Sequence, residues 1–159
     1  MAITAKVDGM DEISEMLTKL EEEGPKAAAA GLYEGAGIMA SGIEAAVDTI
    51  NTAPFKYAAY ITRLPSPEEV DAIRGAIGIA KFDKNGTEVQ TSIGFSNAGY
   101  ADVAGRTKPI ALIANSINSG TSFMHKQPFF RKGVSKAKQK AEAAIIKAIE
   151  DRLDEKNLK

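Results

Sequence analysis

Residues 27–43, "AAAAGLYEGAGIMASGI", combine an alanine-rich composition that favours a helix with glycines that weaken one. Apolar residues recur through this stretch and beyond it at helical spacing, at Ala29, Leu32, Ala36, Met39, Ile43, Val47 and Ile50. A glycine costs a helix about 0.8–1.0 kcal/mol relative to alanine. We therefore expect Gly31, Gly35 and Gly42 to lie where another element approaches closely, and internal packing is favoured over a contact between subunits.

The segments on either side of this helix are also predicted to be regular. Residues 3–7, "ITAKV", are typical of a short strand. Ile13, Met16, Leu17 and Leu20 predict a first helix with Asp11 as its N-cap. Gly24-Pro25 is expected to end that helix and to start the long one. Residues 51–54 should break the long helix.

The period changes from helical to alternating after residue 75. Residues 76–82, "AIGIAKF", and 87–95, "TEVQTSIGF", flank the sequence Asp83-Lys84-Asn85-Gly86. This arrangement predicts a β-hairpin with its turn at 83–86. One face of the second strand should carry Thr87, Val89, Thr91, Ile93 and Phe95.

Further signals complete the predicted fold. Ser66, Pro67 and Glu69 form a capping box for a helix of one or two turns. Small and polar residues at 96–108 predict a flexible loop. Helices are expected from Pro109 to a stop at Gly120 and from Pro128 onward. The apolar side of the last helix is expected at Val134, Ala137, Ala141, Ile145, Ala148, Ile149 and Leu153.

The predicted fold is a single α+β domain over residues 1–159, a length that can bury a core. A small antiparallel sheet with a central β-hairpin is packed by a long helix of the N-terminal half and by a C-terminal helix.

Residues for catalysis or cofactor binding are scarce in this sequence. The chain has no cysteine and one histidine, His125, which is expected to be a solvated or hydrogen-bonded loop residue. The glycine-rich "GAGIMASG", residues 35–42, falls inside the predicted long helix, where its amides are already bonded. We therefore expect no enzyme activity, no metal and no cofactor. No signal peptide or membrane span is visible, so the chain is expected to be soluble and made in the cytoplasm.

Charge is distributed unevenly along the chain. Residues 1–60 carry four lysines against ten acids, and residues 125–159 carry ten lysines and arginines against five acids. These ends could pair within one subunit or between neighbours. A basic patch is predicted at Lys126, Arg131, Lys132, Lys136, Lys138 and Lys140. A solvated helical face is favoured over nucleic-acid binding, which would use phosphates without sequence preference.

Residues 118–130, "NSGTSFMHKQPFF", connect the two last helices. Their composition favours a connector that presents the chain to a partner over a catalytic loop. Phe129 and Phe130 point about 100° apart on a helix. Either both rings lie in the core, or one anchors there while the other reaches a neighbouring surface.

Several of these stretches together resemble the head–tail joining, or tail-completion, family of long-tailed bacteriophages and prophages. They are "VDGMDEISEMLTKL" (residues 7–20), residues 27–43 and the central hairpin. The most specific match is Gly120, Thr121 and Ser122, followed by the step into the last helix at Gln127, Pro128, Phe129 and Arg131. The chain departs from the family at Asn118-Ser119 and in the long segment 54–75.

The resemblance implies a structural virion protein of the phage neck, without catalysis, that joins the DNA-filled head to the tail. Its partners would be copies of itself in a hexameric or dodecameric ring and other neck and tail proteins, with possible non-specific contact to DNA and none to a membrane. A tail terminator or minor tail protein is the nearest alternative, and a small nucleic-acid-binding protein is the alternative from another class. The expected ring or neck contacts are Gly120, Thr121, Ser122, Gln127, Pro128, Phe129, Phe130, Arg131 and Lys132.

Overall fold

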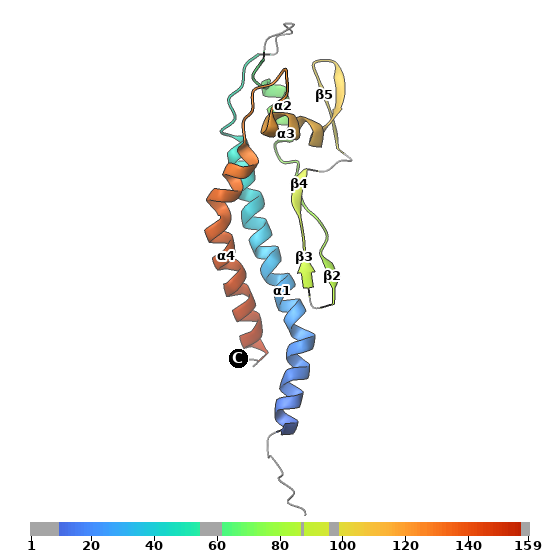
Figure 1. The fold of residues 1–159 in the computed structure, drawn as a ribbon, viewed down its shortest axis with the longest axis vertical. Helices are drawn as coiled ribbons and strands as arrows, with labels where there is room; N and C mark the ends of the chain where they lie inside the picture. The colour runs from blue at the N-terminus through green and yellow to red at the C-terminus, as the bar shows by residue number, and fades with distance from the viewer. Residues whose placement is uncertain (1–9, 55–61, 87, 96–98, 157–159) are drawn as a thin grey trace, which may run out of the picture.

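The structure is a computed structural model that describes residues 10–54, 62–86, 88–95 and 99–156, with side chains from residue 14 onward (Figure 1). The strand expected at residues 3–7 lies outside this description. Asp11 was expected to be an N-cap, but it lies inside the first helix, which begins at Met10.

Four helices and three two-stranded antiparallel pairs make up the described chain, which confirms the predicted α+β class. The helices are α1 (Met10–Val47), α2 (Pro67–Ile73), α3 (Ile110–Ser119) and α4 (Phe129–Glu155). The strands are β1 (Ile77–Ile79), β2 (Asp83–Asn85), β3 (Glu88–Gln90), β4 (Ile93–Phe95), β5 (Tyr100–Val103) and β6 (Arg106–Pro109). The pairs are β1 with β4, β2 with β3, and β5 with β6.

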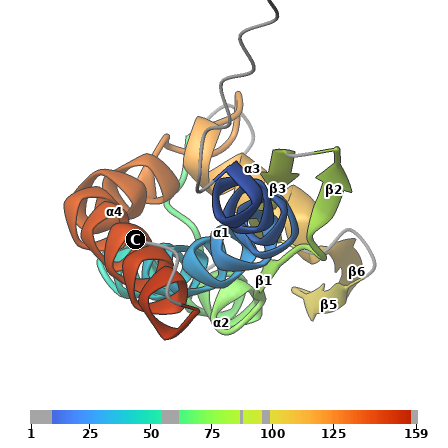
Figure 2. The same cartoon turned by 90° about the horizontal axis from the view of Figure 1, so that it is seen from below.

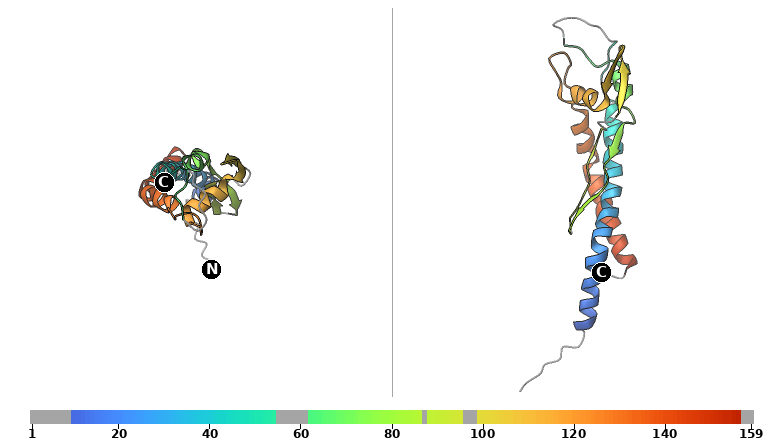
Figure 3. Two further views of the ribbon diagram at one scale, coloured as in Figure 1. Left: turned by 90° about the horizontal axis from the view of Figure 1, so that it is seen from above. Right: turned by 90° about the vertical axis from the view of Figure 1, so that its right-hand side faces the viewer.

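The two long helices, α1 and α4, run antiparallel and side by side, and they give the molecule its elongated shape (Figures 1 and 2). The hairpin of β1 to β4 lies along α1, while α2, α3, β5 and β6 gather at the end where α4 begins (Figures 1 and 3). The core lies at this end, where Ile43 and Val47 of α1 meet Ile73, Ile117 and Phe129.

Small residues let α1 and α4 approach each other closely. A Cβ added to Gly133 of α4 would lie 2.5 Å from the Ile43 Cα and 2.8 Å from the Gly42 carbonyl oxygen. A Cβ on Gly42 would lie 2.6 Å from the Ala137 Cβ, and one on Gly31 would lie 2.9 Å from the Ile145 carbonyl oxygen. The prediction that these glycines mark internal packing is therefore confirmed.

The predicted helix break at Gly24-Pro25 is wrong, because α1 continues through Pro25 as one helix of 38 residues. A proline in a helix interior removes one backbone hydrogen bond and costs about 3 kcal/mol. Beyond it, Ala27 is 1% exposed and Gly31 packs on Ile149 of α4. The free energy gained by packing the later turns of α1 against α4 thus exceeds the cost of Pro25 in the helix. The sequence pattern does not reveal this gain.

The predicted central hairpin is present, but its turn is shorter than expected. The register pairs Asp83 with Gln90 and Asn85 with Glu88, so residues 83–85 belong to β2 and only residues 86 and 87 separate the strands. Gly86 has φ +63°, a backbone conformation that favours glycine. The predicted face of the second strand is confirmed at the described positions, since Val89, Ile93 and Phe95 are half-buried.

A second hairpin occupies most of the segment that was expected to be a flexible loop, residues 96–108. Strands β5 and β6 pair from Tyr100 with Pro109 to Val103 with Arg106. Ala104 and Gly105 between them have φ +51° and +73°. Positive φ at both central residues is the geometry of a tight two-residue hairpin turn. The loop prediction failed because Ala-Gly is a weak turn signal beside Asn-Gly.

The short helices form where the sequence indicates. Helix α2 carries the complete capping box of Ser66 and Glu69. Helix α3 begins after Pro109 and ends at Gly120, and α4 begins after Pro128.

Gly133→Ala is expected to lower the free energy of unfolding by about 2 kcal/mol, because the added methyl group meets backbone atoms of α1 that cannot rotate away. Gly37→Ala, at a position of α1 with no atom within 4 Å of the added Cβ, should instead raise it by about 0.5–1 kcal/mol. Urea unfolding of the two variants and of wild type measures the sign of each change in the free energy of unfolding. Equal effects would contradict the close approach of the helices.

Candidate interaction surface around residues 120–128

The connection between α3 and α4 begins at a glycine that no other residue replaces easily. Gly120 caps α3 by donating its N–H to the Ser116 carbonyl at 3.0 Å, with φ +77°. A Cβ at this position would lie 2.9 Å from the Lys126 Cβ. Both the backbone conformation and the space around it therefore require glycine.

The next four residues form a tight turn that exposes an aromatic ring. Thr121 and Met124 exchange backbone hydrogen bonds of 3.0 and 3.3 Å, and the Thr121 hydroxyl oxygen accepts the Phe123 N–H at 3.2 Å. Met124 is 6% exposed, whereas Phe123 is 66% exposed. The turn thus holds one apolar side chain in the core and presents the next one to solvent.

The turn is attached to the segment that precedes α2. The Arg63 N–H donates to the Phe123 carbonyl, and the His125 N–H donates to the Arg63 carbonyl, both at 2.9 Å. The Arg63 guanidinium in turn makes two hydrogen bonds of 2.6 Å to the Glu69 carboxylate. Lys108 of β6 lies 3.7 Å from the same carboxylate, so Glu69 joins three parts of the chain.

Glu69 is a buried charge with its partners in place. Its residue is 1% exposed, and its carboxylate also accepts the Ser66 N–H at 2.9 Å. Burial acts to raise its pKa, but hydrogen bonds from Arg63 and Ser66, with the charges of Arg63 and Lys108, outweigh burial and hold the pKa below its ordinary value. The carboxylate therefore stays ionised and keeps the three segments together.

Gln127 ties the end of α1 to the start of α4. Its side-chain amide donates to the Asn51 carbonyl at 2.8 Å, and its amide oxygen accepts the Asn51 N–H at 2.9 Å. Its backbone N–H donates to the Ile117 carbonyl at 2.8 Å. One residue therefore fixes three elements.

Both phenylalanines at the start of α4 pack on Phe95 of β4. Phe129 is 2% exposed and Phe130 is half-buried, with ring centroids 6.0 and 6.4 Å from that of Phe95. The Phe130 N–H donates to the Asn118 side chain at 3.2 Å. Phe129 thus lies in the core, whereas Phe130 packs against the core and stays partly exposed, so the two alternatives that the sequence left open remain predictions.

The nine residues expected to make ring or neck contacts thus fall into two groups. Gly120, Gln127, Pro128, Phe129 and Phe130 are buried or half-buried and hold the connection in shape. Thr121, Ser122, Arg131 and Lys132 are exposed. Phe123 was not among the residues expected from the sequence, although an aromatic residue among small hydroxyl residues is the signal that could have found it.

Phe123 borders a hollow of about 230 Å³ together with Leu112, which is 54% exposed. Arg63, Glu69 and Lys108 lie in the same lining. Phe123 and Leu112 thus form a small exposed apolar rim beside the cluster of Arg63, Glu69 and Lys108. We call Phe123, Leu112 and the hollow between them the loop surface.

A second exposed apolar surface lies at the far end of the molecule, on the first turns of α1. These turns extend beyond the end of α4 (Figure 1). Met16, Leu17 and Leu20 are 44%, 60% and 41% exposed. We call residues 14–22 the α1 overhang.

The predicted basic patch is exposed along and just before the first turns of α4, from Lys126 to Lys140. Lys138 lies 3.8 Å from Glu142 of the same helix. Because α1 and α4 are antiparallel, the acidic start of one helix and the basic start of the other lie at opposite ends of the pair (Figure 1).

No cluster of three or more histidine, cysteine, aspartate or glutamate side chains suited to a metal ion occurs among the described residues. His125 is exposed, and residues 35–42 lie within α1. Across the described ranges, no helix combines the length and hydropathy needed to span a bilayer.

Comparison of the chain with known protein families, with curated proteins and with solved structures gives no match.

Glu69→Gln is expected to lower the free energy of unfolding by about 2–3 kcal/mol, because it removes the charge that Arg63 and Lys108 face in a buried site. Glu142→Gln, which removes the acid of an exposed pair, should cost less than about 0.5 kcal/mol. Urea unfolding at neutral pH compares the two. Equal, small losses would show that the Glu69 cluster does not hold the segments together.

Stability should also depend on pH through Glu69. Its pKa is lower in the folded chain, so its contribution is present above the ordinary glutamate pKa of about 4.3 and is lost as the pH falls through the folded value. Wild type is therefore expected to lose more stability than Glu69→Gln on acidification below about pH 5. Thermal melts of both proteins across this range measure the difference, and parallel curves would contradict it.

Proposed function

We propose that this chain is a structural component of the neck of a long-tailed bacteriophage or prophage particle, in which copies form a ring that joins the DNA-filled head to the tail. Its work in this role is adhesion through shape and charge, without catalysis.

One observation carries the proposal, together with the family resemblance at residues 120–131. The subunit has two unlike exposed apolar surfaces at opposite ends: the loop surface near the start of α4 and the α1 overhang. In the proposed particle, the α1 overhang serves the contact between copies, which closes into a ring when the rotation between neighbours allows, and the loop surface serves contact with another neck or tail protein. In the nearest alternative, the chain is a tail terminator or a minor tail protein, and it would use the same surfaces in that role.

The resemblance and the contacts agree on which residues matter for shape. Gly120, Thr121, Gln127 and Phe129 set the turn, the junction with α1 and the start of α4. Thr121, which bonds the backbone of Met124 and of Phe123, holds Phe123 outward. In the proposed role, Phe123 and Leu112 face a neighbouring neck or tail protein, and the scaffold beneath them stays unchanged.

A second candidate function, non-specific binding to nucleic acid, is favoured by the exposed cations from Lys126 to Lys140. Such binding would go through phosphates and would weaken steeply with salt. A gel shift with duplex DNA at low salt tests it, and unchanged mobility of the DNA would remove this candidate.

Loss of the gene is expected to leave full heads and finished tails apart in electron micrographs of the lysate. Complementation with Phe123→Asp should fail to restore joined particles, because a charge replaces the apolar rim of the loop surface. The matched control, Ser122→Ala, changes the neighbouring exposed residue and should restore them.

Circular dichroism of the purified Phe123→Asp protein should match wild type, since an exposed side chain contributes within about 0.5 kcal/mol to stability. Normal particles from the deletion strain would refute the joining role. Full complementation by Phe123→Asp would refute the role of the loop surface.

A further inference from the structure

The α1 overhang continues the face of α1 that packs on α4. Within the helix pair that face carries Gly31, Gly35 and Gly42. Successive residues of a helix are 100° apart, so Leu17 and Leu20 lie on the same side of α1 as these glycines. The side of α1 that α4 covers therefore extends past the end of α4 with large apolar side chains, which are 60% and 41% exposed.

The overhang is also acidic. Glu15, Glu21 and Glu22 are exposed beside a single lysine, Lys19. An antiparallel pairing of two overhangs would bring two such acidic segments together, and like charges at close range disfavour that contact. An apolar surface with a basic border is the better complement.

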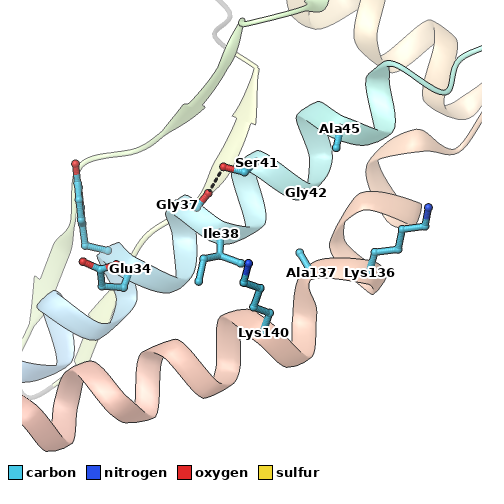
Figure 4. A pocket seen from close by; sticks show the side chains of 10 residues that line it. Glu34, Gly37, Ile38, Ser41, Gly42, Ala45, Lys136, Ala137 and Lys140 are labelled. Carbon is cyan, nitrogen blue, oxygen red and sulfur yellow. Dashed lines mark hydrogen bonds between the residues drawn. The ribbon is translucent and has the colours of Figure 1, made fainter.

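Such a surface exists on the same molecule, in a groove between α1 and α4 (Figure 4). The groove has a volume of about 500 Å³. Its walls include Ile38 and Ala45 of α1 and Ala137 of α4. Gly37 also lines the groove, and no atom lies within 4 Å of the position that a Cβ would take there. Lys136 and Lys140 border it from α4, and Glu34 is the acid in its lining.

The overhang cannot reach the groove of its own subunit. Both lie on one continuous helix, and 22 positions separate Lys19 from Ser41, about 33 Å at a rise of 1.5 Å per residue. The groove of a second copy is accessible, and there Glu21, which lies at the edge of the apolar side of the overhang, would face Lys136 and Lys140.

We propose that the α1 overhang of one copy packs its apolar side into the α1–α4 groove of the next copy, with Lys136 and Lys140 facing Glu21 at the edge of that side. The contact joins two different surfaces, so it repeats from copy to copy. It deepens the proposed neck role by naming the ring contact, but it is a property of the purified chain and can be tested without a virus.

The absence of cysteine from the sequence allows a direct test by cross-linking. Lys19→Cys places a thiol on the exposed surface of the overhang, and Ser41→Cys places one in the groove. The two purified full-length variants are mixed and treated with a short bismaleimide. A cross-linked dimer is expected in the mixture and not in either variant alone.

The double variant Lys19→Cys/Ser41→Cys is expected to give a ladder of oligomers, as a repeating contact requires. Lys84→Cys, on the exposed strand β2, replaces Ser41→Cys in the control mixture, which should give no product. Adding Lys136→Glu and Lys140→Glu to the Ser41→Cys protein should abolish the dimer band, and Lys84→Glu should leave it unchanged.

Cross-linking of Lys19→Cys alone would overturn the proposal in favour of paired overhangs. No product in the mixture would overturn it in favour of another occupant, such as residues 1–9 or a different protein. A ladder from the double variant combined with normal particles from a deletion strain would uphold the contact while refuting the neck role.

Discussion

The close approach of α1 and α4 is the constraint on which the rest of the structure depends. Gly133 brings the α4 backbone against Ile43, and an added methyl group would lie 2.5 Å from its Cα. That contact lies next to the core, where Val47 and Phe129 are buried. It fixes where α4 begins, and therefore where the connection from α3 must end. The elongated pair also explains how α1 passes through Pro25, because the later turns gain more from packing on α4 than the proline costs.

A small number of polar contacts then shapes the end of the molecule that carries the loop surface. Gln127 pairs with the Asn51 backbone, and Glu69 gathers Arg63 and Lys108 in a nearly dry site. The residues that carry the family resemblance mostly do this structural work. Phe123, which is the exposed group, lies between them.

Much of the fold could be predicted from sequence because its signals are local and periodic. The stripe from Ala29 to Ile50, the Ser66–Glu69 capping box and the stop at Gly120 each identified an element. The failures have different physical causes, which are a weak local signal in one case and contacts between distant segments in the others. Pro25 is tolerated because of α4, and the hairpin of β5 and β6 closes on an Ala-Gly turn of weak local preference. The exposure of Phe123 follows from the Thr121–Met124 turn and its bonds to Arg63, which no spacing in the sequence reveals.

The continuity of α1 also bears on how copies would assemble in the proposed role. A helix that ended at Gly24-Pro25 would leave the overhang on a hinge, and the angle between neighbouring copies would then be variable. As one helix, α1 transmits its direction from the glycine contacts with α4 to Met16, Leu17 and Leu20. Whether unlike surfaces build a closed ring or an open filament depends on the rotation between neighbours. In the proposed role, the direction of the continuous helix α1 sets that rotation, and the acidic residues of the overhang disfavour the paired dimer that would end growth.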